Sequence, residues 1–309
     1  MFQAIMYHYI RPFNEELPFF KNLHADDFAK QLDFFEREYG FVSKEDFLDS
    51  FETGVVPKGV LLTFDDGLKC HYEYAFKELK KRNLWGIFYI PTAPYQTNKL
   101  LDVHRIHLLL GMYSGNEVYV ELMELVTNEM LNHDLVAEFQ ELTYHLQEND
   151  DSTQWVKRIL NYYIDYQFRE KVIDQLMRNL IPEELYSIEN FYLTVEEINE
   201  MSNNNMIIGS HTVTHPVMSK LNLDEQHDEI NRSFDFLNSV TNNLEIKTFC
   251  YPYGGFHTFT TESEKLLDQA NCLFSFNVEH RDISIDDIIN RPQALPRYDC
   301  NVFLHGKCR

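Results

Sequence analysis

The sequence feature that most limits how this chain can fold is a short apolar run that ends in two adjacent carboxylates. Residues 60–64 are apolar or β-branched, and Asp65 and Asp66 follow directly, before Gly67. A run of this kind, bracketed by glycines, predicts a buried β-strand that ends at a loop. In folds with parallel strands, catalytic side chains lie at the carboxyl ends of the strands. The alternative interpretation is a pair of loop aspartates that only caps the next helix.

The segments around this run alternate between strand and helix patterns. Strand-like runs occupy residues 4–10, 60–64, 85–90, 206–209, 246–250 and 273–277. Helical spacing of apolar residues occupies 25–39, 43–51, 72–82, 194–203, 223–240 and 260–271. Strands that alternate with helices favour an α/β fold in which crossover helices join parallel strands.

The alternation stops between about residues 96 and 189. Strand patterns disappear there, and helical periodicity covers residues 118–131, 135–146 and 155–180. We interpret 96–189 as a helical insertion within a single body that spans residues 1–309. His104 and His107 lie at the start of the insertion and could approach a site, although two histidines in an amphipathic helix are more often structural.

Composition excludes several classes of function. The net charge of −22 argues against binding to nucleic acid or to an anionic membrane surface. The five cysteines include no Cys-x-x-Cys pair, which argues against a disulfide framework and a cysteine zinc site. No apolar run is long enough to span a bilayer, so no transmembrane segment is expected. The first residues lack the pattern of a signal peptide, and we therefore expect a cytoplasmic protein.

A second polar cluster follows the predicted strand at 206–209. His211 and His215 are four residues apart, and Pro216 disfavours an α-helix at His215, which predicts an extended loop. Two neutral imidazoles and one carboxylate form the three-ligand arrangement of a catalytic metal site, and Asp66 is the natural third ligand. His8, at the end of the predicted strand at 4–10, could face the same site or could be a core histidine.

Three segments together resemble the first three motifs of the polysaccharide deacetylase family, the NodB-like group of carbohydrate esterase family 4. They are Thr-Phe-Asp-Asp-Gly at 63–67, Ser-His-Thr-Val-Thr-His at 210–215 and Phe-Cys-Tyr-Pro-Tyr-Gly at 249–254, and they occur in family order. The resemblance implies a distorted (β/α) barrel, usually seven-stranded. It also implies metal-dependent removal of N-acetyl groups from amino sugars.

The resemblance also assigns roles to single residues. It implies that Asp65 is the general base and that the metal ligands are Asp66, His211 and His215. The segment Tyr251, Pro252 and Tyr253 would shape the sugar site, and the backbone N–H of Tyr253 would help to bind the oxyanion. The expected cofactor is one divalent metal ion, with zinc favoured and cobalt, nickel or manganese as alternatives. The metal would polarise the amide and make water easier to deprotonate, and Asp65 would take that proton.

The sequence departs from the family pattern in two places. The histidine that protonates the departing amine is expected either at His8, in an N-terminal Met-Tyr-His that resembles a circularly permuted branch, or at His305, in a C-terminal Leu-His-Gly. We favour His8. The usual arginine before the third motif's Pro-Tyr is absent, with Phe249 and Cys250 in its place. Arg297 could orient Asp65 instead, or could be a surface arginine.

The sequence therefore predicts a hydrolase that deacetylates an N-acetylated sugar, which could be nucleotide-linked, lipid-linked or a short oligosaccharide. The helical insertion could close over such a small ligand. Two alternatives stay open. The same metal site could remove formyl groups or hydrolyse another amide. Alternatively, the protein could be a carbohydrate-binding protein that has lost catalysis. The oligomeric state is not determined by the sequence.

Overall fold

The computed structural model describes residues 1–143, 149–182, 187–241 and 243–309, with the side chains at 137, 138 and 140–142 left aside. The chain divides into two compact units. The first comprises residues 1–12, 22–99 and 189–309, and the second comprises 13–21 and 100–188. The second unit contains most of the segment that we interpret as an insertion, together with residues 13–21, which no sequence pattern assigned to it.

The first unit is built on a parallel sheet of seven strands, which confirms the predicted α/β fold of the distorted (β/α) barrel type. The strands are β1 (Phe2–Tyr7), β2 (Gly59–Phe64), β3 (Ile87–Ile90), β4 (Ile207–Ser210), β5 (Thr248–Cys250), β6 (Phe274–Phe276) and β7 (Tyr298–Asp299). Their order across the sheet is β6-β5-β4-β3-β2-β1-β7, and every pairing is parallel. Six of these strands fall within or beside the runs that the sequence indicates, and the two-residue β7 had no such signal.

The segment that precedes β7 connects the two edges of the curled sheet. Leu295 pairs with Phe276 at the end of β6, and two residues after Pro296 the chain pairs with β1 through Tyr298. The backbone N–H of Leu295 donates to the carbonyl of Ser275 at 2.9 Å. Residues 295–299 therefore lie along the seam between β6 and β1, and Arg297 lies in the middle of that seam.

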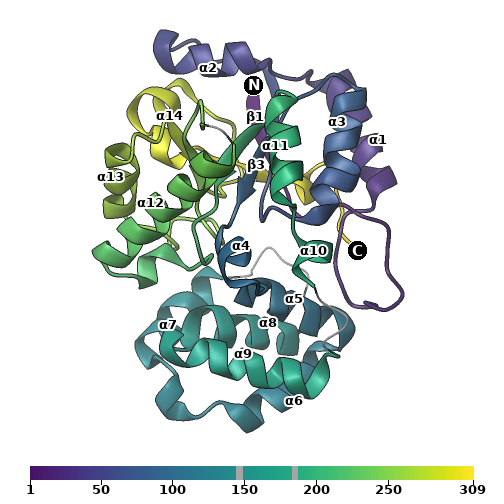
Figure 1. Ribbon diagram of the computed structural model, residues 1–309, viewed down its shortest axis with the longest axis vertical. Helices are drawn as coiled ribbons and strands as arrows, with labels where there is room; N and C mark the ends of the chain where they lie inside the picture. The colour runs from purple at the N-terminus through teal and green to yellow at the C-terminus, as the bar shows by residue number, and fades with distance from the viewer. Residues whose placement is uncertain (144–148, 183–186, 242) are drawn as a thin grey trace. The chain divides into compact units, whose positions relative to one another are not determined.

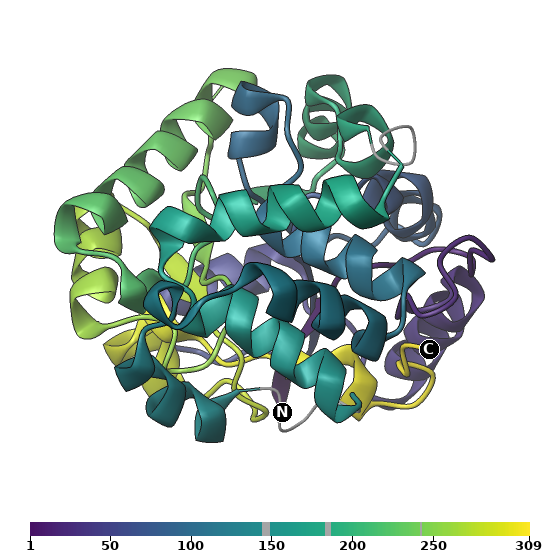
Figure 2. The ribbon, with the colours of Figure 1, turned by 90° about the horizontal axis from the view of Figure 1, so that it is seen from below.

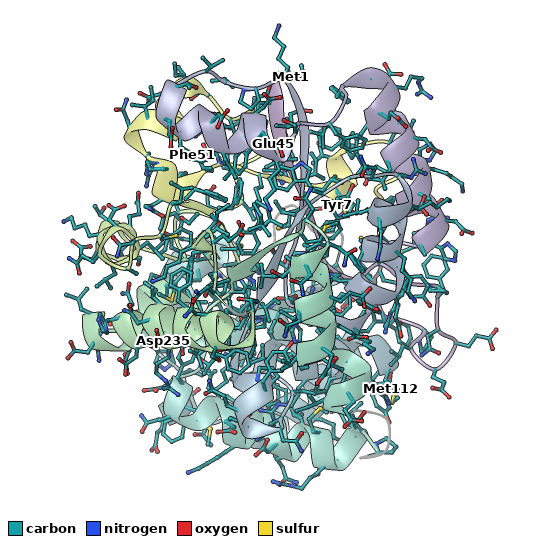
Figure 3. The ribbon with its side chains drawn as sticks, turned by 45° about the horizontal axis from the view of Figure 1, so that its top comes forward. Met1, Tyr7, Glu45, Phe51, Met112 and Asp235 are labelled. Carbon is teal, nitrogen blue, oxygen red and sulfur yellow. The ribbon has the colours of Figure 1, made fainter. Side chains whose placement is uncertain are left out.

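Helices cover the sheet of the first unit. They are α1 (Ala25–Glu38), α2 (Lys44–Thr53), η1 (His71–Phe76), α3 (Lys77–Lys81), α4 (Ala93–Thr97), α11 (Val195–Asn203), α12 (Leu223–Val240), α13 (Thr261–Gln269) and α14 (Ile285–Asn290). In Figure 1, α1 and α3 lie on one side of the sheet and α12, α13 and α14 on the other. Tyr7 at the end of β1 is buried in the interior, whereas Met1 at its start projects into solvent (Figure 3).

The amphipathic pattern of the helices explains this packing. Phe28, Leu32 and Phe35 recur at helical spacing on α1 and are buried against Tyr7 and Phe64 of the sheet. The strands are buried on both faces, as their nearly continuous apolar sequences predict. Helix α11 begins with the capping box at Thr194 and Glu197 that the sequence indicates.

The second unit is helical, as predicted, and its helices pack side by side (Figure 2). They are α5 (Asp102–Met112), α6 (Gly115–Leu125), α7 (His133–Leu142), α8 (Asp151–Arg158) and α9 (Tyr166–Leu180), with the short segments η2 (Asn128–Met130) and η3 (Ile159–Tyr163). The short α10 (Ile188–Phe191) leads back to the first unit. His104 and His107 lie on α5 with ring centroids 5.9 Å apart.

Two helix predictions in this unit are wrong in extent. The helix predicted at 155–180 is broken after η3, because Ile164 is extended and Asp165 caps a new helix with its side chain. The helix predicted at 118–131 ends at Leu125. The last residues of the helix predicted at 135–146 lie outside the described part of the chain. Among the described residues, no helix is both long and apolar enough to cross a membrane.

Candidate metal centre and catalytic carboxylate

The candidate site lies at the carboxyl end of the parallel sheet. His8 follows β1, Asp65 and Asp66 follow β2, and His211 follows β4. Tyr7 pairs with Phe64 in register, and the backbone N–H of Asp65 donates to the carbonyl of Tyr7 at 2.9 Å. Because all the strands are parallel, the loops that follow them meet at one edge of the sheet. The site residues thus converge although they are up to about two hundred residues apart in sequence.

Asp66, His211 and His215 form a buried cluster of possible metal ligands. The Nε2 atoms of the two histidines lie 3.5 Å and 3.4 Å from Oδ1 of Asp66. One ligand atom from each of the three residues lies within 4.8 Å of the other two. These separations exceed those of good N–H···O hydrogen bonds. They match the ~3.4 Å that separates neighbouring donor atoms when each is about 2.1 Å from a shared tetrahedral ion.

The hydrogen bonding of His211 also suits a metal ligand. Its Nδ1 lies 2.7 Å from the carbonyl oxygen of Cys250. Because a carbonyl oxygen only accepts, Nδ1 carries the proton and Nε2 is left as the electron-pair donor that faces Asp66. Burial, followed by the neighbouring His215, lowers the pKa of His211 to about 4, so the ring is neutral at physiological pH. The residues present therefore fit a divalent cation bound by one carboxylate and two imidazoles.

Backbone conformation separates the two adjacent carboxylates. Asp66 has a φ of 83°, a region that few residues other than glycine adopt. This turn of the backbone directs Asp66 towards the histidines while Asp65 continues from the strand towards Arg297. Strained conformations of this kind cost of order 1–3 kcal/mol and persist where the surrounding structure holds them, often at functional sites.

The loop that carries the two histidines differs from the prediction. The sequence predicts an extended loop, but Thr212 and His215 have φ values of 67° and 59°. The prediction is wrong because side chains bond to the loop's own backbone. Oγ of Ser210 accepts from the N–H of Thr212 at 3.2 Å, and Oγ1 of Thr212 accepts from the N–H of His215 at 2.9 Å. The resulting tight turn brings the two imidazole rings to 4.7 Å between centroids.

Glu229 on α12 holds the same loop from outside. Its Oε2 accepts hydrogen bonds from the backbone N–H groups of Val213 and Thr214, at 2.7 Å and 2.9 Å. Its Oε1 accepts from the hydroxyl of Thr214 at 2.6 Å. Sequence reasoning missed Glu229, because one glutamate on an acidic amphipathic helix carries no signal of this role.

The Asp65 carboxylate is paired with Arg297. The guanidinium donates from Nη1 to Oδ1 at 2.8 Å and from Nη2 to Oδ2 at 2.7 Å. Its other N–H groups donate to the carbonyl of Asn277, to Oγ1 of Thr63 and to Sγ of Cys250, so all five donors are used. Arg297 is completely buried, and the structure therefore rules out the surface alternative.

This pairing decides the protonation of Asp65. Burial alone would raise the pKa of the carboxyl group, but the charge and hydrogen bonds of Arg297 outweigh burial and lower it to about 2. The carboxylate is therefore ionised throughout the physiological range, as a general base requires. One of its oxygens lies within 4.8 Å of a ring nitrogen of His211, so this carboxylate is next to the candidate metal ligands.

Of the two candidates for the acid, only His8 lies near Asp65. It is half-buried and close enough for its charge to contribute to the low pKa of Asp65. His305 is exposed on the C-terminal segment, with a φ of 66°. The geometry therefore favours His8 over His305, and its role as the acid stays a prediction.

A further histidine, His71, which sequence reasoning missed, forms a hydrogen bond with the backbone of His8. Nε2 of His71 lies 2.8 Å from the backbone carbonyl of His8, to which it donates. His71 is completely buried beside Phe64 and Phe88. Burial lowers its pKa to about 4. Its only signal in the sequence is its place one turn after the carboxylate pair.

The two tyrosines of the third motif lie in different surroundings. The ring of Tyr251 is buried and stacks on Phe259 at 3.9 Å, and its hydroxyl donates to the carbonyl of Gln293. The side chain of Tyr251 thus belongs to the core and does not line a sugar site. Tyr253 has a φ of 66°, and its ring lies 5.0 Å from that of His215. The role of Pro252 in shaping the sugar site stays a prediction. The role of the backbone N–H of Tyr253 in binding the oxyanion also stays a prediction.

The chain is similar to known proteins in part of its sequence and in its fold. The family model described as polysaccharide deacetylase matches residues 150–271, which include the second and third motifs. No curated protein matches the chain. The fold resembles a deacetylase from Streptococcus pyogenes, PplD, solved in complex with acetate. Identity is 18%, the TM-score is 0.58, and the match covers 96% of this chain and 91% of that one.

Two further solved structures share the fold. IcaB from Ammonifex degensii is 17% identical, with a TM-score of 0.55 and coverage of 96% of this chain and 90% of that one. A de-N-acetylase from Aggregatibacter actinomycetemcomitans is 14% identical, with a TM-score of 0.51 and coverage of 96% and 94%. The chain is therefore similar to polysaccharide deacetylases in the family-model match over residues 150–271, in its three motifs and in its barrel fold.

Proposed function

We propose that the protein is a metal-dependent hydrolase that removes the N-acetyl group from an amino sugar. One observation carries the proposal. A carboxylate held ionised by a buried arginine lies next to a cluster of one carboxylate and two imidazoles that is spaced for a single cation. A hydrolase for amides needs these two elements, because an amide carbonyl is a poor electrophile and water a poor nucleophile.

A divalent cation held by Asp66, His211 and His215 would polarise the amide carbonyl and make water easier to deprotonate. Asp65 accepts the proton of the attacking water, because its carboxylate is ionised and next to the metal ligands. Arg297 holds both oxygens of that carboxylate and fixes the direction from which the base acts.

Two other residues complete the reaction. The oxyanion that forms on the substrate needs a fixed donor, and the backbone N–H of Tyr253 is the proposed one. The amine must be protonated before it can leave, and we assign that step to the ring of His8. His71 holds the backbone of His8 through its Nε2–H and thereby limits the positions of that ring.

The proposal is tested by acetate release from N-acetylated amino-sugar oligomers and nucleotide-linked N-acetyl sugars, with the metal-free protein loaded in turn with zinc, cobalt, nickel or manganese. We expect turnover only in the loaded protein. Faster hydrolysis of N-formyl than of N-acetyl substrates would show that the protein is a deformylase that uses the same site. Sugar binding without hydrolysis under every metal would show that it is a carbohydrate-binding protein and not an enzyme.

The proposal also includes a preference for a small, carrier-linked sugar over a wall polymer. Cell fractionation tests the expected cytoplasmic location. Competition between nucleotide-linked and polymeric substrates for the same enzyme tests the substrate class.

A further inference from the structure

Cys250 contacts both members of the Asp65–Arg297 pair. It is completely buried at the end of β5. Its Sγ accepts from Nη2 of Arg297 at 2.9 Å and lies 3.5 Å from Oδ2 of Asp65, to which its S–H donates. The same Nη2 donates to the same Oδ2 at 2.7 Å. Sulfur, guanidinium and carboxylate thus form a closed ring of three contacts.

The proton of the thiol has two acceptors within reach, Oδ2 of Asp65 at 3.5 Å and the carbonyl of Tyr251 at 3.7 Å. The carboxylate is both closer and charged, and charged acceptors form the stronger hydrogen bonds. The thiol therefore acts as a donor to the base.

The size of Cys250 is as important as its proton. The guanidinium of Arg297 comes from the seam between β6 and β1 and fills the space beside the thiol, between the rings of Tyr89 and Phe276 at 5.9 Å and 5.6 Å. Protein interiors are packed without spare volume. A long side chain at position 250 would occupy the face of Asp65 that Arg297 now holds.

Two other roles for this cysteine do not fit the geometry. Asp65, His211 and Cys250 also have ligand atoms within 4.8 Å of one another. The guanidinium lies 2.7 Å from Asp65 and 2.9 Å from the sulfur, so its fixed positive charge would repel a second cation there. A role as an oxidation sensor requires an accessible thiolate, whereas this thiol is buried.

We propose that Cys250 is a positioning residue for the catalytic base. Its small volume admits Arg297 to the site, and its thiol fixes the angle of the Asp65 carboxylate. Its backbone carbonyl fixes the tautomer of His211 in the metal cluster, so one residue aligns the two halves of the site. This inference rests on the proposed hydrolase function for its kinetic consequences but not for its spectroscopic ones.

The kinetic test compares substitutions at position 250 in the metal-loaded protein. Cys250→Ser keeps a small donor and should retain activity within about 3-fold. Cys250→Ala removes the donor and should lower kcat by ~10-fold, with KM and metal content unchanged, which is about 1.4 kcal/mol in the barrier. An alanine variant with the wild-type kcat, or a serine variant as impaired as the alanine one, would overturn the proposal.

A reciprocal exchange tests the volume argument. Cys250→Arg alone places two guanidinium groups on one carboxylate and should lose most activity. The double variant Cys250→Arg/Arg297→Ala should recover at least ~10-fold over that single variant, because it removes the competing group; coupled residues give such non-additive effects. Circular dichroism shows whether the double variant is folded. If it is folded but no more active than Cys250→Arg, the claim that the small volume of Cys250 admits Arg297 is wrong.

A spectroscopic test needs no activity and no metal. The S–H stretch of Cys250 is identified in the infrared spectrum of the metal-free protein as the band that Cys250→Ser removes. Asp65→Asn weakens the acceptor, so this band should shift to higher frequency while the bands of Cys70 and Cys272 stay in place. A band unmoved by Asp65→Asn excludes the hydrogen bond. Failure of the wild-type protein to hydrolyse any amide would instead refute the hydrolase proposal. The infrared result would still decide whether the thiol of Cys250 donates to Asp65.

Discussion

Asp65 and Asp66 are neighbours in sequence, both are about 2% exposed, and yet their surroundings are opposite. Asp65 faces a guanidinium that holds both of its oxygens at 2.7–2.8 Å. Asp66 faces two imidazole nitrogens at 3.4–3.5 Å, a distance that suits a shared cation better than a hydrogen bond. A single backbone turn at Asp66 separates the carboxylate that we propose as the base from the one that we propose as a metal ligand.

The comparison teaches that charge compensation decides the role of a buried carboxylate. An ionised carboxylate in the interior needs a positive partner. For Asp65 the partner belongs to the chain itself, and it lowers the pKa to about 2. For Asp66 the partner that the geometry suits is an ion from solution. The predictions below test this division, from the largest expected effect to the smallest.

Matched substitutions of the two carboxylates should separate the two roles. Asp65→Asn should lower kcat by about 10²–10⁴-fold while bound metal stays near one per chain, because only the proton acceptor is lost. Asp66→Asn should lose the metal itself, and excess metal should restore part of its activity. Metal analysis beside steady-state kinetics distinguishes the two. Loss of metal from Asp65→Asn with full activity restored by added metal would reverse the assignments.

Arg297→Lys should damage the Asp65 half of the site alone. Lysine keeps the charge but lacks the planar set of donors that now holds five acceptors, so the substitution is not conservative here. Breaking a buried ion pair costs about 3–5 kcal/mol when one charge is left uncompensated, and the lysine variant should lose part of that. Denaturant unfolding measures the loss, with Arg281→Lys at the partly exposed Arg281–Asp287 pair as the control.

The pH dependence of activity should change in the same variant. In the wild-type protein the pKa of Asp65 is lowered to about 2, so no loss of the base is expected until the pH approaches that value. Weaker pairing leaves burial to raise this pKa, and the acid limb of kcat/KM should move to higher pH. An acid limb at the same pH in both proteins would show that Arg297 does not control the protonation of the base.

His71 should make the metal-free protein less stable in acid. Its pKa is about 4 in the folded protein and about 6.5 in the unfolded chain, so the unfolded chain binds the extra proton between these values. The stability is fully present above pH 6.5 and is lost as the pH falls towards 4, by ~3 kcal/mol in total. His71→Gln keeps a donor for the carbonyl of His8 without titrating, and its unfolding free energy should depend less on pH over this range.

Glu229 should affect the metal half of the site only, and modestly. Glu229→Ala removes three hydrogen bonds to the histidine loop and should weaken metal binding by about 10–100-fold, as is typical of residues that orient metal ligands. At saturating metal, kcat should stay close to that of the wild-type protein. Asp228→Ala, at an exposed neighbouring carboxylate, is the control and should leave metal affinity unchanged. Titration of the metal-free proteins measures the difference.

The sequence was a good guide to the elements and a partial guide to the site. Six of the seven strands could be placed from apolar runs, because a strand buried on both faces needs a continuous apolar sequence. Tyr298 and Asp299 form a strand too short to leave a pattern. The turn at Thr212 and His215 could not be predicted either, because local side-chain hydrogen bonds select it over the extended form that β-branched residues favour.

By itself, the sequence determined which chemical groups the chain carries and the order of the three motifs that hold them. Only the tertiary structure decided which groups meet. Asp65 and Arg297 are 232 positions apart, and Asp65 and Cys250 are 185 apart. Such contacts depend on which strand ends share one edge of the sheet and on where the seam between β6 and β1 closes. That is a property of strand order and register, and a linear pattern does not contain it.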